Sequence, residues 1–295
     1  MSIILKFDSL AQRLGAWAGM GAMSAFVLLW GCGAIVTRWA LDHGSASAVL
    51  LARYGVAFLL VLLIGLKRGQ WLPQRGTRRL VAAAGLVMVA GYCVCYFESM
   101  SKGITPGMLA AVLGVQPVLT LLLLEPRGIT PQRLGGLLLA LGGLVMVVWQ
   151  SLLSTSFNVA GLLFALAALA CITTGALLQK RIKQSPLEVL PLQYAVTVAV
   201  CLLFAQVQPM RWEMTTGFWL PVIMLGVVVS VVAQLLLYRL IQRGNLVNVT
   251  SLFYLVPGVT VALDFLVLGN AMPALALLGM VFILAGVVAD RKSVV

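Results

Sequence analysis

The strongest constraint in this sequence is a series of long segments without a single Asp, Glu, Lys or Arg. Such runs occupy residues 14–37, 80–97, 103–124, 189–210, 214–238 and 244–263. The hydrocarbon core of a bilayer is about 30 Å thick and a helix rises about 1.5 Å per residue, so about 20 apolar residues cross it once. Each of these runs therefore predicts one transmembrane α-helix.

The remaining apolar stretches supply the other spans. The run 134–179 is divided by the polar segment 151–158, the region 265–289 is interrupted by Gly269, Asn270 and Pro273, and the run 46–66 carries a single charge, Arg53. The apolar run after the charged N-terminal segment is too long for a signal peptide, so we expect an uncleaved first helix. The sequence predicts an all-α integral membrane protein with ten transmembrane helices, near residues 16–40, 46–66, 79–98, 105–125, 133–150, 158–180, 188–207, 215–238, 246–267 and 272–289.

The composition excludes an ordinary soluble domain. Charged residues make up only 9% of the chain and hydrophobic residues 62%, with a mean hydropathy of +1.07, whereas soluble domains carry roughly 25% charged residues. The net charge of +12 could suggest nucleic acid, but a basic patch needs a solvated face, and this chain has little of one. The expected partners are membrane lipid and a small-molecule substrate, with no nucleic acid.

The basic residues alternate between the two sides of the predicted bundle. Sixteen of the 20 Lys and Arg residues fall on the side of the two termini: Lys6, Arg13, Lys67, Arg68, Arg75, Arg78, Arg79, Arg127, Arg133, Lys180, Arg181, Lys183, Arg239, Arg243, Arg291 and Lys292. The other side has Arg38, Lys102 and Arg211, and Arg53 lies within a span. Because cytoplasmic loops collect Lys and Arg, both termini should be cytoplasmic, in an inner membrane.

Internal matches indicate a duplicated unit of five helices. Gly136 matches Gly279, because each is followed seven residues later by another glycine. The distance along the chain from Pro117 to Pro257 is the same as that from Arg53 to Gln193. Because five is an odd number, two tandem copies must cross the membrane in opposite directions. The sequence thus predicts a 5+5 inverted repeat with domains 1–151 and 152–295. In transporters of this kind the substrate site lies near the midplane, where the halves meet.

The chain also resembles EamA-type members of the drug/metabolite transporter superfamily along nearly its whole length. The resemblance rests on the Leu-Trp-Gly triplet at 29–31, the Leu-Ala-Arg-Tyr segment at 51–54, and proline-bearing helices 4 and 9 followed by glycine-rich helices 5 and 10. It implies a 5+5 inverted-repeat carrier with cytoplasmic termini and a central cavity, exporting amino acids or other metabolites.

Three charged residues are candidates for binding or coupling. A charge in the membrane costs about 2.5–3.5 kcal/mol on insertion scales, so Arg53 should face the bundle and could attract a substrate carboxylate or tune an acidic neighbour. Alternatively it reaches the interface, or pairs structurally with Glu98 or Asp264. Glu98 and Asp264 are candidate proton-titrating groups, with the proton as coupling ion, or interfacial acids that balance nearby cations.

Mid-helix aromatic and amide side chains are candidate substrate contacts. Tyr92 and Tyr96 are four residues apart and share one helix face. The other candidates are Trp30, Gln116, Tyr194, Gln234 and Tyr254. A binding cavity needs a few such groups among apolar walls, although Trp and Tyr also anchor helices at membrane interfaces and buried amides also join helices.

Two prolines are candidate hinges. Pro117 and Pro257 each remove a hydrogen bond inside a predicted helix, which permits a kink; the kink could move or could only shape packing. The glycines seven residues apart in helices 5 and 10 would allow close helix contact.

The sequence shows no catalytic or metal-binding motif. The five cysteines lie inside predicted helices and His43 is the only histidine, so we expect no metal and no cofactor, and a P-loop or GxSxG motif is also missing. The preferred hypothesis is a secondary transporter, not an enzyme, that exports a small organic metabolite by alternating access as a monomer or homodimer. The alternatives are a membrane-embedded enzyme acting on a lipid or lipid-linked substrate, and a passive channel.

Overall fold

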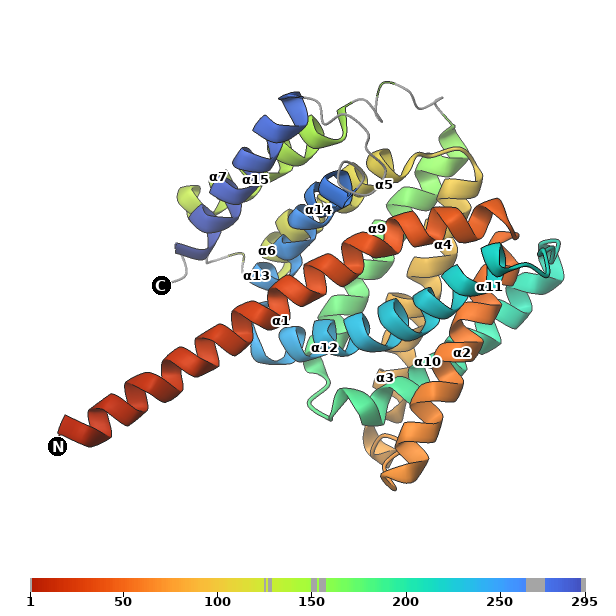
Figure 1. Ribbon diagram of the computed structural model, residues 1–295, viewed down its shortest axis with the longest axis horizontal. Helices are drawn as coiled ribbons and strands as arrows, with labels where there is room; N and C mark the ends of the chain where they lie inside the picture. Colours follow the sequence, from red (N-terminus) through yellow and green to blue (C-terminus); the bar gives the residue numbers. More distant parts are fainter. Residues whose placement is uncertain are drawn as a thin grey trace.

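The computed structural model describes residues 2–124, 126, 129–149, 153, 158–263 and 274–292, and only the backbone of residues 2–20, 34, 106, 260, 261, 263, 291 and 292. The first half of the bundle contains α1 (Ser2–Asp42), α2 (Ala46–Lys67), η1 (Arg75–Thr77), α3 (Arg78–Ala84), η2 (Gly85–Gly91), α4 (Tyr92–Ser101), α5 (Pro106–Leu113), α6 (Gln116–Leu124) and α7 (Pro131–Val147). The second half contains α9 (Val159–Arg181), α10 (Pro186–Val207), α11 (Thr216–Ile223), η3 (Met224–Ala233), α12 (Gln234–Arg243), α13 (Leu246–Thr250), η4 (Ser251–Tyr254), α14 (Leu255–Leu263) and α15 (Ala274–Lys292). Figure 1 shows their arrangement.

These elements form the ten spans that the sequence predicts. Within the described residues, seven helices are long and apolar enough to cross a membrane, and three shorter apolar helices complete the set, at Pro131–Val147, Leu246–Val259 and Ala274–Asp290. The first helix differs most from its prediction of 16–40, because it begins at Ser2. Counting charge-free residues finds the part of a helix that suits lipid, whereas the backbone can stay helical beyond it.

Polar side chains fix several helix starts. The side chains of Ser45, Thr105, Thr130, Asn158 and Asn245 each accept a hydrogen bond from a backbone N–H in the first turn of the following helix. The first N–H groups of a helix have no partner within it, so Ser, Thr and Asn are favoured there.

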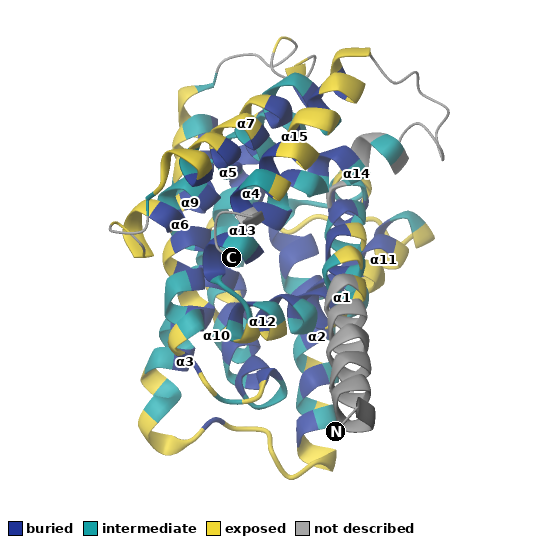
Figure 2. Ribbon diagram, turned by 90° about the vertical axis from the view of Figure 1, so that its left-hand side faces the viewer, coloured by how far each residue is buried: buried dark blue, intermediate teal, exposed yellow. Residues whose placement is uncertain are grey.

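The outer surface of the bundle is apolar. Large hydrophobic side chains such as Leu59, Leu123, Leu163 and Leu203 are more than half exposed. Figure 2 shows exposed positions along the outward sides of the helices and buried positions between them. A soluble protein rarely exposes so much contiguous apolar surface, whereas a bilayer accepts it.

The packing of α7 against α15 has the symmetry of an inverted repeat. The two helices lie side by side (Figure 1). A Cβ added to Gly143 would lie 2.5 Å from the carbonyl oxygen of Gly279, and one added to Gly136 would lie 2.8 Å from that of Gly286. Each contact maps onto the other when the two halves are exchanged. The glycines therefore permit direct backbone contact between equivalent helices of the two repeats.

Irregular helix segments also recur at equivalent places. The third span contains the π-helical segment η2 and the eighth contains η3. The fourth span is interrupted between α5 and α6, and the ninth passes through the 3-10 segment η4. Each interruption comes just before the proline of its span, Pro117 or Pro257. These interruptions and π-helical segments were not part of the sequence prediction.

The loops define two faces of the bundle. The basic face is the side on which α2, α9 and α12 end, with Lys67, Arg181 and Arg243 in their last turns. There the Gln184 side chain accepts a hydrogen bond from the backbone N–H of Gln74 at 2.8 Å. On the opposite face the loop at residues 43–45 pairs with residues 211–213 through backbone bonds and a bridge between Gly44 and Trp212. Each tie joins one repeat to the other.

Candidate functional site

A cavity of about 310 Å³ lies between the two repeats. Its walls come from α1, α2, η2, α4, α5, the first residue of α6 and the C-terminal end of α7 in the first half, and from α9, η3, α12, η4 and α14 in the second. Volumes of about 300–1,000 Å³ are usual for small-molecule sites. Both repeats therefore contribute to one compartment.

The cavity extends from the middle of the bundle toward the opposite face. Thr37 lies five residues before the end of α1, Phe97 four residues before the end of α4, and Gly107 in the first turn of α5; all line the cavity. All three of those helix ends lie at the opposite face. The deepest lining residues, such as Gln234 and Pro257, lie well inside their spans.

Contacts between helix ends hold the basic face together. Lys180 Nζ donates to the carbonyl oxygens of Ile241, at 2.6 Å, and of Gly244. Gln242 Nε2 donates to the carbonyl oxygen of Gln184 at 2.6 Å. Nearby, the largely buried Arg133 and Asp290 side chains approach to 3.3 Å. No residue of these helix ends is among the described residues that line the cavity.

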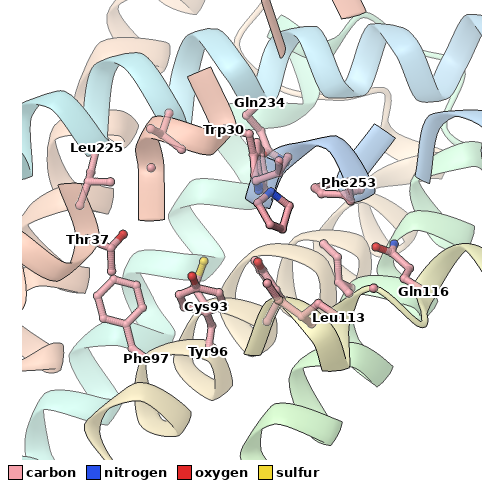
Figure 3. A pocket seen from close by; sticks show the side chains of 18 of the residues that line it. Trp30, Thr37, Cys93, Tyr96, Phe97, Leu113, Gln116, Leu225, Gln234 and Phe253 are labelled. Carbon is pink, nitrogen blue, oxygen red and sulfur yellow. The ribbon is translucent and has the colours of Figure 1, made fainter. Parts of the chain in front are cut away.

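Aromatic rings form much of the wall. Trp30 of α1 meets Phe253 of η4 edge to face, with centroids 5.6 Å apart. Tyr92 and Tyr96 of α4 lie with ring centroids 5.7 Å apart, and Phe97 follows them. In Figure 3, Trp30 lies on one side of the cavity and Tyr96 on the other. Such rings can hold the apolar body of a solute.

A few polar groups lie among these rings. Gln116 begins α6, Gln234 begins α12, and Thr37 and Cys93 also line the cavity (Figure 3). The Cys93 thiol lies 2.9 Å from the Tyr54 hydroxyl. Few polar groups in an apolar wall can orient a bound molecule.

Arg53 brings a positive charge to the wall. It lies in α2 with only 8% of its surface exposed, and it lines the cavity. Its Nε donates to Ser230 Oγ of η3 at 2.7 Å, and its guanidinium carbon lies 5.1 Å from the centre of the Tyr54 ring. The side chain therefore joins α2 of one repeat to η3 of the other.

The two interrupted spans also reach the cavity. Pro117 cannot donate to the carbonyl oxygen of Leu113, and Pro257 cannot donate to that of Phe253, because proline has no N–H. Leu113, Phe253 and Pro257 line the cavity. The prolines thus weaken helical bonding in the wall itself.

Most of the predicted contact residues meet at this cavity, but some do not. Trp30, Tyr92, Tyr96, Gln116 and Gln234 line it, as do Arg53 and Pro257. Two tyrosines pack in the core beside it. The Tyr194 hydroxyl donates to the Ser230 carbonyl oxygen, and Tyr254 packs with residues of α7 and α15. A substrate contact by either stays a prediction.

Of the two predicted acids, only Glu98 lies within the described residues. Glu98 Oε2 lies 3.7 Å from Lys102 Nζ, so the structure favours the pairing with Lys102 over one with Arg53. Asp264 lies outside the described residues, so its role stays a prediction. Pro117 is buried beside the cavity in α6.

The sequence prediction missed Thr37, Cys93, Phe97 and Phe253. For Phe253 a signal existed, because it lies four residues before Pro257, where the carbonyl loses its helical donor. The other three have no such signal, because only the packing of distant helices turns their faces toward the cavity.

Comparison with known proteins gives the family. The sequence pattern of the EamA-like transporter family matches this chain twice, at residues 17–149 and 159–289. A protein of known crystal structure is similar in fold, with a TM-score of 0.79 and 21% identity over 93% of this chain and 96% of that one. No curated protein sequence matched. The chain belongs to the EamA-like transporter family, a family of membrane transporters and not of enzymes.

Proposed function

We propose that this protein is a secondary transporter that carries a small organic metabolite by alternating access. The observation that carries the proposal is the position of the cavity: it lies between two inverted repeats and reaches toward one face, while the described lining includes no residue of the helix ends that contact one another at the other face. This is the arrangement expected of a carrier caught with one side closed.

We further propose that the basic face is cytoplasmic and that the membrane is the cell inner (plasma) membrane. The support is the Lys and Arg excess on that face, which favours a cytoplasmic location for both termini. With this orientation the cavity faces outward. The resemblance to exporters favours export, and a proton remains the candidate coupling ion through Glu98 or Asp264.

The division into domains 1–151 and 152–295 belongs to the same proposal. Its exact boundary lies outside the described residues, in the segment between the two family matches. Because one chain already contains both repeats, a monomer would be sufficient for transport, and a homodimer would be two complete carriers.

Reconstitution in liposomes tests this proposal. Proteoliposomes preloaded with a pooled metabolite extract and diluted into a labelled extract should show saturable counterflow of at least one solute. A passive channel would give flux without counterflow. A lipid enzyme would change the lipid or the solute chemically, which mass spectrometry of the same vesicles would detect.

A matched pair of variants links the flux to the cavity. Gly33→Leu places a side chain in the cavity wall, where a Cβ has room beside Val229 at 3.5 Å, and should abolish counterflow. Gly55→Leu adds the same side chain to α2, where a Cβ meets nothing within 4 Å, and should leave it intact. Equal flux through both variants would contradict transport through this cavity.

A further inference from the structure

We infer that Arg53 is the anion-binding group of the cavity and that the substrate is a carboxylate with an apolar or aromatic body. This inference rests on the proposed transport function and makes its substrate class more specific. It follows from the charge balance of the buried residues, from the difference between the two repeats, and from the composition of the cavity wall.

Burying the Arg53 guanidinium costs free energy. A buried charge requires a partner, since even a well-placed hydrogen bond to a neutral group does not neutralise it. The partners in the structure are the Ser230 hydroxyl and the Tyr54 ring, and both are neutral. The guanidinium retains donors that can bind a carboxylate in a two-point geometry.

A counterion for Arg53 within the protein would have to be one of its acidic residues. Eight acidic residues occur in the sequence, and five have described side chains. Four of these have other basic side chains as partners: Asp42 lies 3.3 Å from Arg38, Glu98 3.7 Å from Lys102, Glu213 3.0 Å from His43, and Asp290 3.3 Å from Arg133. The fifth, Glu188, lies in the first turn of α10 at the basic face.

The described part of the cavity wall contains no acidic residue. Of the acids whose side chains are not described, Asp8 and Glu125 belong by sequence to the basic side, and Asp264 to the opposite side. Asp264 is therefore the single alternative counterion, and the experiment below includes it.

Arg53 differs from its equivalent in the second repeat in its surroundings. The equivalent residue of the second repeat, Gln193, lies in α10 and is fully buried. Its Nε2 donates to Gln179 Oε1 at 2.9 Å, and its Oε1 accepts from the Tyr238 hydroxyl at 2.8 Å. In the second repeat, the side chain at this position has hydrogen-bond partners within the protein. In the first repeat, the side chain at this position is a cation that lines the cavity.

The rest of the substrate would meet the aromatic part of the cavity wall. Trp30, Tyr92, Tyr96 and Phe253 supply aromatic surface in the same cavity as the Arg53 cation. The ammonium group of an amino acid would meet no acidic side chain in the described wall. The wall therefore suits a carboxylate without an ammonium group better than a zwitterion or an amine.

Four probes with one phenylpropyl skeleton separate these possibilities. Purified full-length protein is titrated with 3-phenylpropanoate, its neutral amide, phenylalanine and 3-phenylpropylamine, and binding is read from the thermal unfolding temperature and tryptophan fluorescence. We expect the carboxylate to bind at least about 30-fold more tightly than the amide, because losing one partner of a desolvated charge pair costs about 2 kcal/mol or more. Equal binding of carboxylate and amide, tighter binding of phenylalanine, or no binding of the carboxylate overturns the inference.

The variants assign the charge. Arg53→Gln should lose the preference for the carboxylate over the amide, while Arg53→Lys should keep part of it. Arg38→Gln removes an exposed arginine of the same repeat and should change nothing. The wild-type comparison of carboxylate and amide decides the matter even if Arg53→Gln does not fold.

Asp264→Asn completes the set. If Asp264 is the counterion, this variant loses stability and Arg53→Gln/Asp264→Asn regains it, which overturns the inference; if not, Asp264→Asn keeps the carboxylate preference. Counterflow in liposomes is scored separately. Its failure for every solute defeats the transport proposal, whereas counterflow that ignores the carboxylate defeats only the assignment of Arg53.

Discussion

At neighbouring positions of α2 and α10, the two repeats share one residue and differ in charge at the next. Tyr54 and Tyr194 occupy equivalent positions of the two repeats, and the centroids of their rings lie 5.6 Å apart. The residues directly before them are Arg53, which lines the cavity, and Gln193, which is held in a buried hydrogen-bond network. The repeats therefore share a contact and differ in charge within one step of the chain.

This difference separates two requirements. The glycines that bring α7 and α15 together are the same in both halves, because equivalent helices of the two inverted copies make the same contact. Arg53, which lines the cavity, has no charged equivalent in the second half, because a substrate with one charged end needs one charged site.

The largest effect is expected where the ends of the α7 and α15 pair differ. Arg133 and Asp290 form a buried ion pair at the basic face. In the register that matches Gly136 with Gly279, their repeat equivalents at the other end are the apolar Ala276 and Val147. Arg133→Met should lower the free energy of unfolding by about 3–5 kcal/mol, because it leaves Asp290 as an uncompensated buried charge. Unfolding by SDS titration measures this.

The double variant Arg133→Met/Asp290→Leu should regain most of that loss, since it makes the basic end resemble the apolar end. Arg38→Met, which breaks an exposed pair with Asp42, is the matched control and should cost less than about 1 kcal/mol. A loss in Arg133→Met no larger than in Arg38→Met would mean that the two ends are energetically equivalent.

The next effect tests the shared glycine contact. Gly143→Ala and Gly286→Ala, which are repeat equivalents, should each cost about 1–3 kcal/mol, because the new methyl group would meet the backbone of the facing helix. The same titration serves here. Gly142→Ala is the control, since a Cβ at Gly142 meets nothing within 4 Å. A cost at only one of the two equivalent glycines would contradict a symmetric contact.

A smaller effect is expected at the two prolines. Pro117→Ala and Pro257→Ala each supply a donor for the carbonyl of Leu113 or Phe253, and one hydrogen bond is worth about 1 kcal/mol. If both spans bend during transport, each variant should slow turnover about fivefold at unchanged substrate affinity. Counterflow rates and binding titrations separate the two quantities.

The control is Pro191→Ala, because Pro191 lies inside the continuous helix α10 and does not line the cavity. Slower turnover in all three variants would indicate a general effect of proline. Unchanged turnover in Pro117→Ala and Pro257→Ala would make both prolines static kinks.

The sequence predicted the ten spans because hydropathy depends on each segment alone. It placed Tyr92 and Tyr96 together because their spacing fixes a common helix face. It could not separate these tyrosines from Tyr194 and Tyr254, since all four are mid-helix and only the packing of distant segments decides which meet the cavity. The π-helical segments η2 and η3 escaped prediction for a similar reason: their apolar sequences also suit an ordinary helix.

The smallest effect concerns the two ties between loops. On the opposite face the tie is made by the backbone, with Ser45 N donating to the Arg211 carbonyl oxygen at 2.7 Å. On the basic face it depends on the side chain of Gln184, which bonds to Gln74 and Thr77. A side-chain substitution can therefore remove only the second tie.

Gln184→Ala should favour opening of the basic face by about twofold, because partly exposed hydrogen bonds are worth only about 0.5 kcal/mol. A cysteine placed at Val247, which is fully buried at the start of α13, reports this opening through its rate of maleimide labelling in a background without the five native cysteines. Glu213→Gln, which weakens the side-chain contact to His43 but leaves the backbone tie on the opposite face, should leave the rate unchanged. If Gln184→Ala also leaves it unchanged, the closure of the basic face depends on other contacts there, such as those of Lys180 and Gln242 at the ends of α9 and α12.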